Sequence, residues 1–270
     1  MRLRWIIALS LIVGIALAAL LVSYAAPWGE STPSPALVTE EDEDFGTVTV
    51  YAVLDDGSLD PAATGLALEV WETFTRVATP EFVSSVMMQY RVGDAPASDT
   101  LAYVYQDDDP QYWILAANLA TSDDPQQLVA TLIHEYAHTL TLSTDELEVV
   151  PECDTLELEE GCALSDSILG EFAQEFWSAY GDDAPDAANT DADVAYEFYL
   201  ANEDDFVSDY AATNIVEDVA ESFMTFVLED EPTGDSIAAL KLAFLWERPD
   251  LVEIRERIRS EFAEDLGLVG

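Results

Sequence analysis

Both histidines of the chain lie in one ten-residue segment, TLIHEYAHTL, residues 131–140. His134 and His138 stand four positions apart, so on an α-helix their imidazoles lie one above the other on the same face. Glu135 follows the first histidine and is rotated from it by about 100° around the helix axis. This HExxH spacing lets two imidazoles bind one metal ion while the glutamate remains free to act as a general base. We therefore expect this segment to fold as a helix that carries part of a metal site.

A core helix with two hydrogen-bonded histidines is the competing interpretation of this segment. Two buried imidazoles would each need a separate polar partner, and their desolvation is costly. Ser122 and Asp123 precede the segment as possible helix caps, and Pro125 stands where a first helical turn tolerates proline. From there the sequence can run as one helix of about four turns.

A third metal ligand has to come from another part of the chain. A catalytic zinc needs three protein ligands and an open position, and with no further histidine the third is an aspartate, a glutamate or a cysteine. Asn214 can cap a helix in which Glu217 falls in the first turn and Glu221 lies on the same face one turn later. Two carboxylates aligned on an apolar helix face are costly unless something positive pairs with them. Zinc would compensate Glu217, and an imidazole N–H would engage Glu221. The alternative is that both are solvated acids of a very acidic protein.

The stretch Ser208–Phe223 follows the pattern S-x-Y-x-x-T-N-x-x-E-x-x-A-E-x-F. It resembles the segment after HExxH in the gluzincin zinc metallopeptidases related to anthrax lethal factor. The resemblance covers this stretch and Leu132–Leu140, with little matched between them. It implies a zincin-like domain that binds one Zn²⁺ per chain.

The resemblance implies a role for three residues of the second segment. Glu217 matches the glutamate that binds zinc beside His134 and His138. Tyr210 matches a tyrosine whose hydroxyl stabilises the developing oxyanion, and Glu221 belongs to the shell that supports the ligands. The acidic surface and the cysteine loop of this chain depart from the family, so substrate specificity does not carry over.

The remaining patterns predict an α+β fold, with a small N-terminal sheet followed by a mostly helical part. Residues 47–54 alternate like a strand, residues 61–79 read as an amphipathic helix, and a further helix is expected at 81–90. Two strands flank a turn at residues 107–110, and we expect the second, Trp113–Asn118, to offer a free edge to an extended substrate. Later helices are expected at roughly 166–180, 191–201, 215–229, 236–247 and 250–264.

The composition of the N-terminal region indicates that the chain has three parts. Arg2 and Arg4 precede an uncharged, mostly apolar run of 22 residues, Trp5 to Ala26. Roughly 20 residues suffice to cross a bilayer, so residues 1–26 are either a signal anchor or a long signal peptide that is cleaved. Both place the rest of the chain outside the cytoplasm, secreted or anchored by one helix. Residues 27–46 read as an acidic, proline-containing linker, and residues 47–270 as the metallopeptidase domain.

Cys153 and Cys162 are the chain's two cysteines and lie nine positions apart, far from either histidine. In an oxidising compartment this spacing indicates one disulfide that closes a short loop and contributes roughly 2–3 kcal/mol. As zinc ligands they would need partners that this part of the sequence lacks.

The charge of the chain excludes one class of partner. The 55 acidic residues stand against 9 basic ones, giving a formal charge of −46. Such a surface repels phosphate backbones, so we expect no nucleic-acid partner. The acidity reflects either adaptation to high salt, which the even spread of the acids favours, or attraction of a cationic partner.

These features together predict an extracytoplasmic zinc-dependent endopeptidase that acts on a peptide or protein. Glu135 would take a proton from a metal-activated water as that water attacks the peptide carbonyl, and would deliver it to the leaving amine. Two alternatives remain: a surface-displayed, zinc-containing binding module without turnover, and a maturation protease dedicated to one partner. The oligomeric state is left open by the sequence.

Overall fold

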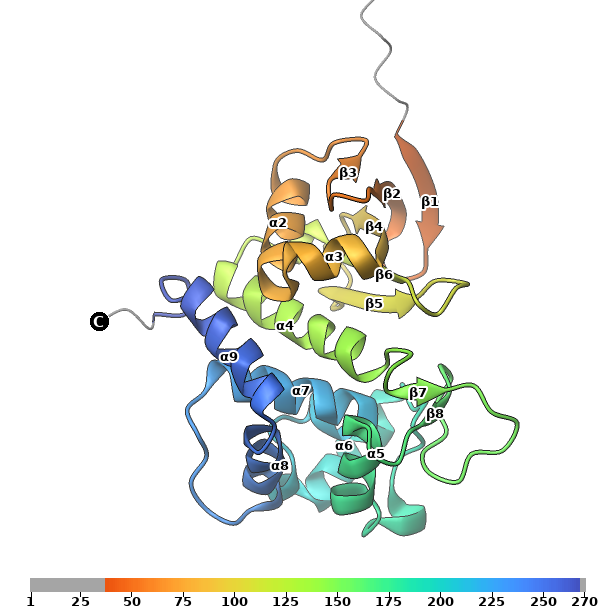
Figure 1. The fold of residues 1–270 in the computed structure, drawn as a ribbon, viewed down its shortest axis with the longest axis vertical. Coiled ribbons are helices and arrows are strands. Elements are labelled where there is room, and N and C mark those ends of the chain that lie inside the picture. Colours follow the sequence, from red (N-terminus) through yellow and green to blue (C-terminus); the bar gives the residue numbers. More distant parts are fainter. Residues whose placement is uncertain (1–36, 268–270) are drawn as a thin grey trace, which may run out of the picture. The chain divides into compact units, whose positions relative to one another are not determined.

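Six strands form the main sheet of the protein, whose computed structural model describes residues 37–267 (Figure 1). The strand order is β1-β2-β4-β6-β5, and β3 pairs with β2 beside this path. The pair β4–β6 is parallel and the other pairs are antiparallel. The strands are β1 (Val38–Asp42), β2 (Gly46–Val53), β3 (Leu59–Asp60), β4 (Met87–Gly93), β5 (Ala102–Gln106) and β6 (Trp113–Asn118).

Two helices, α2 (Leu66–Ala78) and α3 (Pro80–Val86), lie between the strands of the sheet in sequence. The others follow the sheet: α4 (Pro125–Thr141), α5 (Ile168–Phe172), α6 (Ala192–Ala201), α7 (Ile215–Leu228), α8 (Ile237–Trp246) and α9 (Pro249–Glu261). A two-stranded sheet of β7 (Leu147–Glu148) and β8 (Cys162–Ala163) lies between α4 and α5 in the sequence. The expected α+β architecture, a small sheet followed by a helical part, is confirmed.

Strand β1 lies inside the stretch 27–46 that the sequence indicated as a linker. It pairs antiparallel with β2 from Val38↔Val50 to Asp42↔Gly46. The Asp42 carboxylate accepts hydrogen bonds from the backbone N–H groups of Asp44 and Phe45, at 3.0 and 2.9 Å, which fixes the turn between the two strands. The folded part therefore includes these residues. Their acidic side chains suit an exposed edge strand, which charges protect from further pairing.

Two further expectations about the sheet are wrong. The helix expected at 81–90 ends at Val86, and residues from Met87 onward form β4 in the middle of the sheet, where Tyr90 is fully buried. Strand β6 (Trp113–Asn118) is not an edge strand, because it lies between β4 and β5 with all six residues buried. Its continuous apolar run is typical of a strand covered on both faces. The free edge on this side of the sheet belongs to β5.

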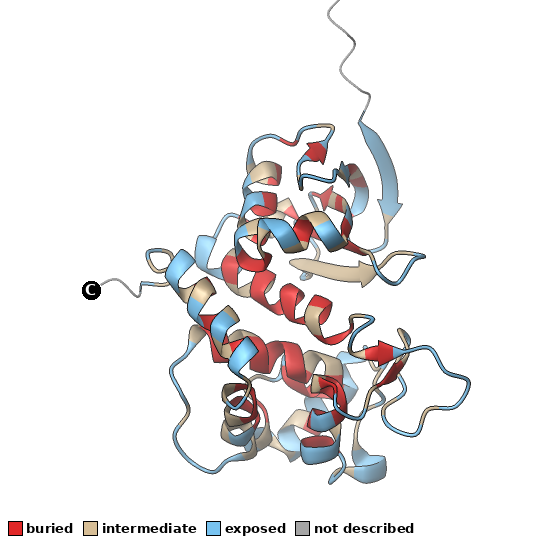
Figure 2. Cartoon of the chain, in the orientation of Figure 1, coloured by how far each residue is buried: buried red, intermediate tan, exposed pale blue. Residues whose placement is uncertain are grey.

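Helix α4 packs against both β5 and α7 and so connects the sheet with the helical part (Figure 1). Figure 2 shows that the facing parts of α4 and α7 are largely buried. Asp124 caps α4, one residue after the expected caps, by accepting hydrogen bonds from the N–H groups of Gln126 and Gln127 at 2.9 and 3.1 Å. Asn214 caps α7 as expected, accepting from Val216 and Glu217 at 2.8 and 2.9 Å. These caps fix which residues of each helix face the other.

The disulfide expected between Cys153 and Cys162 is present, with Cα atoms 5.5 Å apart. It closes part of the loop that runs from β7 to the start of β8. The expected membrane segment, residues 1–26, lies outside the described residues. Between residues 37 and 267, no helix combines the length and the apolar character that crossing a membrane requires.

Candidate metal centre

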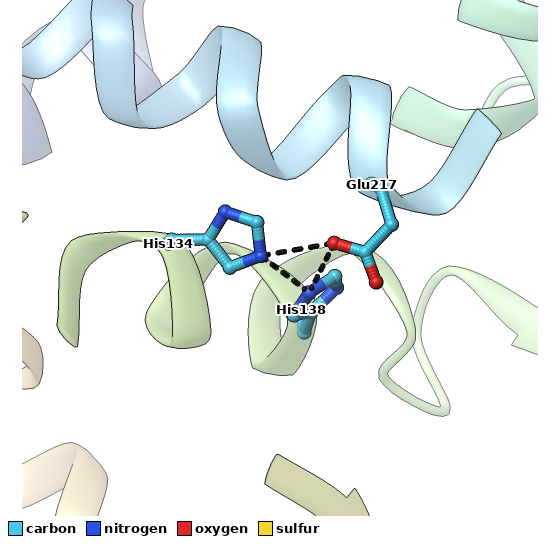
Figure 3. A group of neighbouring side chains, drawn as sticks. All are labelled: His134, His138 and Glu217. Carbon is cyan, nitrogen blue, oxygen red and sulfur yellow. Dashed lines mark hydrogen bonds and ion pairs between the residues drawn. The ribbon is translucent and has the colours of Figure 1, made fainter. Parts of the chain in front are cut away.

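Helices α4 and α7 bring two imidazoles and one carboxylate to a common point (Figure 3). His134 Nε2 lies 3.0 Å from His138 Nε2 and 3.0 Å from Glu217 Oε2. The third side of this triangle, from His138 Nε2 to Glu217 Oε2, measures 3.5 Å. The three residues that the sequence placed at a metal site are thus close enough to bind one ion.

The triangle fits a divalent metal in size and in chemistry. Zinc ligands at about 2.0–2.2 Å in tetrahedral geometry lie roughly 3.3–3.6 Å from one another, close to the distances found here. Glu217 Oε2 is buried and lies within ion-pair distance of both imidazoles, but no residue between 37 and 267 donates a hydrogen bond to it, and His138 Nδ1 also has no hydrogen-bond partner among these residues. A buried carboxylate oxygen left without a partner is costly, and a cation at the centre of the triangle would satisfy it.

Glu221 fixes the orientation of the first histidine. Its Oε1 lies 2.9 Å from His134 Nδ1, the ring nitrogen that points away from the triangle. Its Oε2 accepts a hydrogen bond from Ser208 Oγ at 2.6 Å, and that hydroxyl oxygen accepts one from the Ala211 N–H at 3.1 Å. A carboxylate on the second nitrogen of a histidine sets its tautomer and increases its basicity, which is the usual support of a metal ligand. Ser208 stood in the sequence pattern, but no role was assigned to it.

The charges of the site reinforce one another. Desolvation lowers the pKa of His134, but the adjacent carboxylates of Glu217 and Glu221 outweigh it and raise that pKa to about 10. Desolvation would raise the pKa of Glu217, yet the two histidines hold it well below its usual range. The pKa of Glu221 is also lowered against its desolvation, through the hydrogen bond to His134. Both carboxylates are therefore anionic at neutral pH, and both favour positive charge on or beside His134.

Glu135 lies beside the triangle without belonging to it. Its side chain is buried, and its Oε2 accepts a hydrogen bond from the backbone N–H of Val104 in β5 at 3.0 Å. Desolvation raises the pKa of Glu135 to about 7, although the charges of His134 and His138 oppose the rise. A carboxylate with a pKa near neutrality can both accept and return a proton, as a general base must.

Tyr210 opens a 3₁₀ turn, Tyr210–Ala212, that packs against α7 and α6. Its ring centroid lies 5.9 Å from that of His134, and the residue is 52% exposed. Desolvation and the carboxylates of Glu217, Glu135 and Glu221 raise the pKa of Tyr210, so its hydroxyl stays protonated at neutral pH. The tyrosine therefore offers a protonated hydroxyl beside the carboxylates of the site.

Two surface cavities meet at Tyr210. One, of 570 Å³, is lined by Leu101 and Ala102 of the β5 side, Met224 of α7, and the site residues His134 and Glu135. The other, of 480 Å³, lies beside the start of α6 and is lined by Glu217 among others. Residues of the triangle thus line both cavities, His134 the first and Glu217 the second.

A buried ion pair anchors α7 next to the candidate ligand. Asp218 and Lys241 are both 0% exposed, with Asp218 Oδ2 2.6 Å from Lys241 Nζ. The same oxygen accepts a hydrogen bond from Trp177 Nε1 at 2.8 Å, and Lys241 also donates to the Asp205 carbonyl at 2.8 Å. Sequence reasoning missed this pair. The available signal was the chain's only lysine, which stands inside the apolar helix IAALKLAFLW.

Comparison with protein-family models finds no family that matches this chain, and neither the curated proteins nor the solved structures that were searched give a match. The resemblance to gluzincins therefore has the two short segments as its only support from sequence.

Proposed function

We propose that the protein is a zinc-dependent endopeptidase of the gluzincin type. The observation that supports this is the convergence of His134 Nε2, His138 Nε2 and Glu217 Oε2, with distances between 3.0 and 3.5 Å, beside the buried carboxylate of Glu135. Two histidines and one glutamate form the ligand set of catalytic zinc sites that keep a fourth position open. A purely structural zinc site has four protein ligands and no need for a base.

Zinc bound at these residues supplies a Lewis acid that lowers the pKa of a water molecule toward about 7 and polarises a carbonyl oxygen. Glu135 takes one proton from the attacking water while the water oxygen forms a bond to the peptide carbonyl carbon. It then delivers that proton to the amine nitrogen as the C–N bond breaks. The second proton of the water stays on the new carboxyl group and then passes to the amine or to solvent, so the products are one carboxylate and one amine or ammonium group, and Glu135 returns to its starting state.

Tyr210 is proposed to donate its hydroxyl proton as a hydrogen bond to the developing oxyanion. Replacing Tyr210 with phenylalanine removes this donor while keeping the ring. We expect kcat to fall about 10²–10³-fold, the effect of losing one such donor, with zinc content and KM nearly unchanged. Steady-state kinetics with one cleaved peptide test this. Full turnover in the Tyr210→Phe variant would exclude the hydroxyl from the mechanism.

Zinc binding is expected to release protons. Without metal, His134 has a pKa of about 10 and is protonated at neutral pH, whereas zinc binds the neutral imidazole. At about pH 7.5 each zinc should displace about one proton, and zinc affinity should rise with pH until the pH exceeds the pKa of His134. Calorimetric titrations in two buffers of different ionisation enthalpy measure this number. The Glu221→Gln variant, which weakens the ion pair with His134, should release less. Equal heats in both buffers would contradict the prediction.

The finer fold class and the location are part of the same proposal. The sheet edge β5 runs beside the helix that carries both histidines, an arrangement that supports a zincin-like domain. The disulfide between Cys153 and Cys162 supports an oxidising compartment, since such bonds persist mainly outside the cytoplasm. We therefore propose that the domain acts in an extracytoplasmic space on peptide or protein substrates.

A cleavage screen tests this function directly. Full-length protein, loaded with zinc, is incubated with a proteome-derived peptide mixture at low and at high salt, because repulsion within so acidic a chain can unfold it in dilute buffer. New internal cleavage sites that disappear with a chelator and in Glu135→Gln are the expected result. Cleavage confined to one protein would indicate a dedicated maturation protease. Bound zinc without any cleavage would indicate the binding module and contradict the endopeptidase proposal.

A further inference from the structure

Strand β5 is the free edge of the main sheet on the side of α4, and its backbone groups alternate between two directions. The Leu101 carbonyl accepts from the Asn118 N–H, and the Asp107 N–H donates to the Tyr112 carbonyl, both at 2.9 Å. These bonds continue the antiparallel pairing of β5 with β6 and show that odd-numbered residues face β6. The N–H and C=O groups of Ala102, Val104 and Gln106 therefore point away from β6, toward the open edge.

One of these outward-pointing backbone groups already has a hydrogen-bond partner. The Val104 N–H donates to Glu135 Oε2 at 3.0 Å, so the edge strand and α4 are linked by a backbone-to-carboxylate hydrogen bond. Glu135 is only 5% exposed, and it lines the 570 Å³ cavity. Within residues 37–267 its other oxygen, Oε1, has no hydrogen bond. The two oxygens of this carboxylate thus have different surroundings.

We infer that the backbone N–H of Val104 positions Glu135 for catalysis by holding Oε2, which leaves Oε1 as the oxygen that takes the proton from water. This inference rests on the proposed function. A glutamate side chain has three rotatable bonds, and hydrogen bonds to ionised acceptors are stronger and shorter than neutral ones. Fixing one oxygen therefore selects one orientation of the carboxylate before substrate arrives, which is how a second contact makes a site precise.

The inference also limits how substrate can pair with β5. An extended peptide that adds to this edge can use the backbone groups of Ala102 and the carbonyl of Val104, but the Val104 N–H is occupied by Glu135. The opposite assignment is that substrate takes the Val104 N–H and displaces Glu135. The two assignments predict different kinetics, because loss of a substrate contact raises KM while loss of a positioning group lowers kcat.

Amide hydrogen exchange tests the hydrogen bond between the Val104 N–H and Glu135 without measuring catalysis. In full-length protein, with and without zinc, the amide of Val104 should exchange slowly, while the Ala102 amide on the same outward face serves as an internal control and should exchange fast. The protection should persist in Glu135→Gln, whose side-chain carbonyl still accepts, and be lost in Glu135→Ala. A Val104 amide that exchanges as fast as that of Ala102, or that is unaffected by Glu135→Ala, would overturn the inference.

The kinetic test uses Val104→Pro, which removes this N–H at a position where an edge strand tolerates proline. The control, Val104→Ala, trims the side chain but keeps the N–H. We expect Val104→Pro to lower kcat about 10–100-fold, with KM and zinc content unchanged, and Val104→Ala, which keeps the N–H, to lower kcat far less. A raised KM with unchanged kcat would overturn the inference in favour of a substrate contact. If the unmutated protein binds zinc but cleaves nothing, the proposed function fails, while hydrogen exchange still decides whether Val104 holds Glu135.

Discussion

Replacing Glu135 with glutamine will keep the metal and lower kcat by about 10²–10⁴-fold, the contribution of a general base. Glutamine has the same shape, and its side-chain carbonyl can still accept the hydrogen bond from the Val104 N–H. Its amide cannot take up a proton, however, whereas the carboxylate has a pKa raised by desolvation to about 7, which suits that task. The experiment measures kcat with one cleaved peptide and zinc per chain on the same preparation.

A matched control for this variant is Glu72→Gln on α2, since Glu72 is an exposed glutamate far from the histidines in sequence. It makes the same chemical change on the surface and should leave both zinc content and kcat unaltered. If Glu135→Gln turned over as fast as this control, another group would be the base. If it lost the zinc, Glu135 would be a ligand rather than a base.

Replacing Lys241 with methionine will lower the free energy of unfolding by about 3–5 kcal/mol, because one partner of a buried ion pair is left behind. Asp218 and Lys241 are both fully buried, and Lys241 Nζ also lies 3.9 Å from the ring centroid of Phe206. Methionine keeps most of the packing volume and removes the charge. Desolvation raises the pKa of Asp218 to about 6 even with the lysine present, so its carboxylate depends on that partner. Urea denaturation of the full-length protein measures the change.

Two further variants serve as controls for this experiment, one at the buried pair and one at an exposed ion pair. The double variant Lys241→Met with Asp218→Asn should recover much of the loss, because the neutral amide can still accept the hydrogen bond from Trp177 Nε1 and carries no charge to compensate. Asp230→Asn breaks an ion pair with Arg259 in which Asp230 is 96% exposed, and it should cost about 0–1 kcal/mol. A loss in Lys241→Met no larger than in Asp230→Asn would show that the buried pair does not stabilise the fold.

The candidate site could be predicted from sequence because its parts are local patterns. His134 and His138 are one helical turn apart, and so are Glu217 and Glu221, so each helix fixes the direction of its own pair once it forms. Asp124 and Asn214 cap these two helices. The packing of α4 against α7 then brings the two pairs to one point.

The parts that sequence did not predict depend on contacts between distant segments. Residues 87–90 follow a helix directly, and only the neighbours β2 and β6 make them a central strand. The Val104–Glu135 bond involves a backbone N–H, which carries no residue-specific signal. Lys241 and Asp218 lie 23 positions apart on different helices, so their pairing follows from how α7 and α8 pack.

The central claim is that His134, His138 and Glu217 together bind one zinc ion. Anomalous X-ray scattering from crystals of the zinc-loaded protein, recorded above and below the zinc absorption edge, tests it most directly. We predict one peak per chain, about 2.0–2.2 Å from His134 Nε2, His138 Nε2 and Glu217 Oε2. No zinc peak between the two helices, or a peak whose ligands do not include Glu217, would contradict the account.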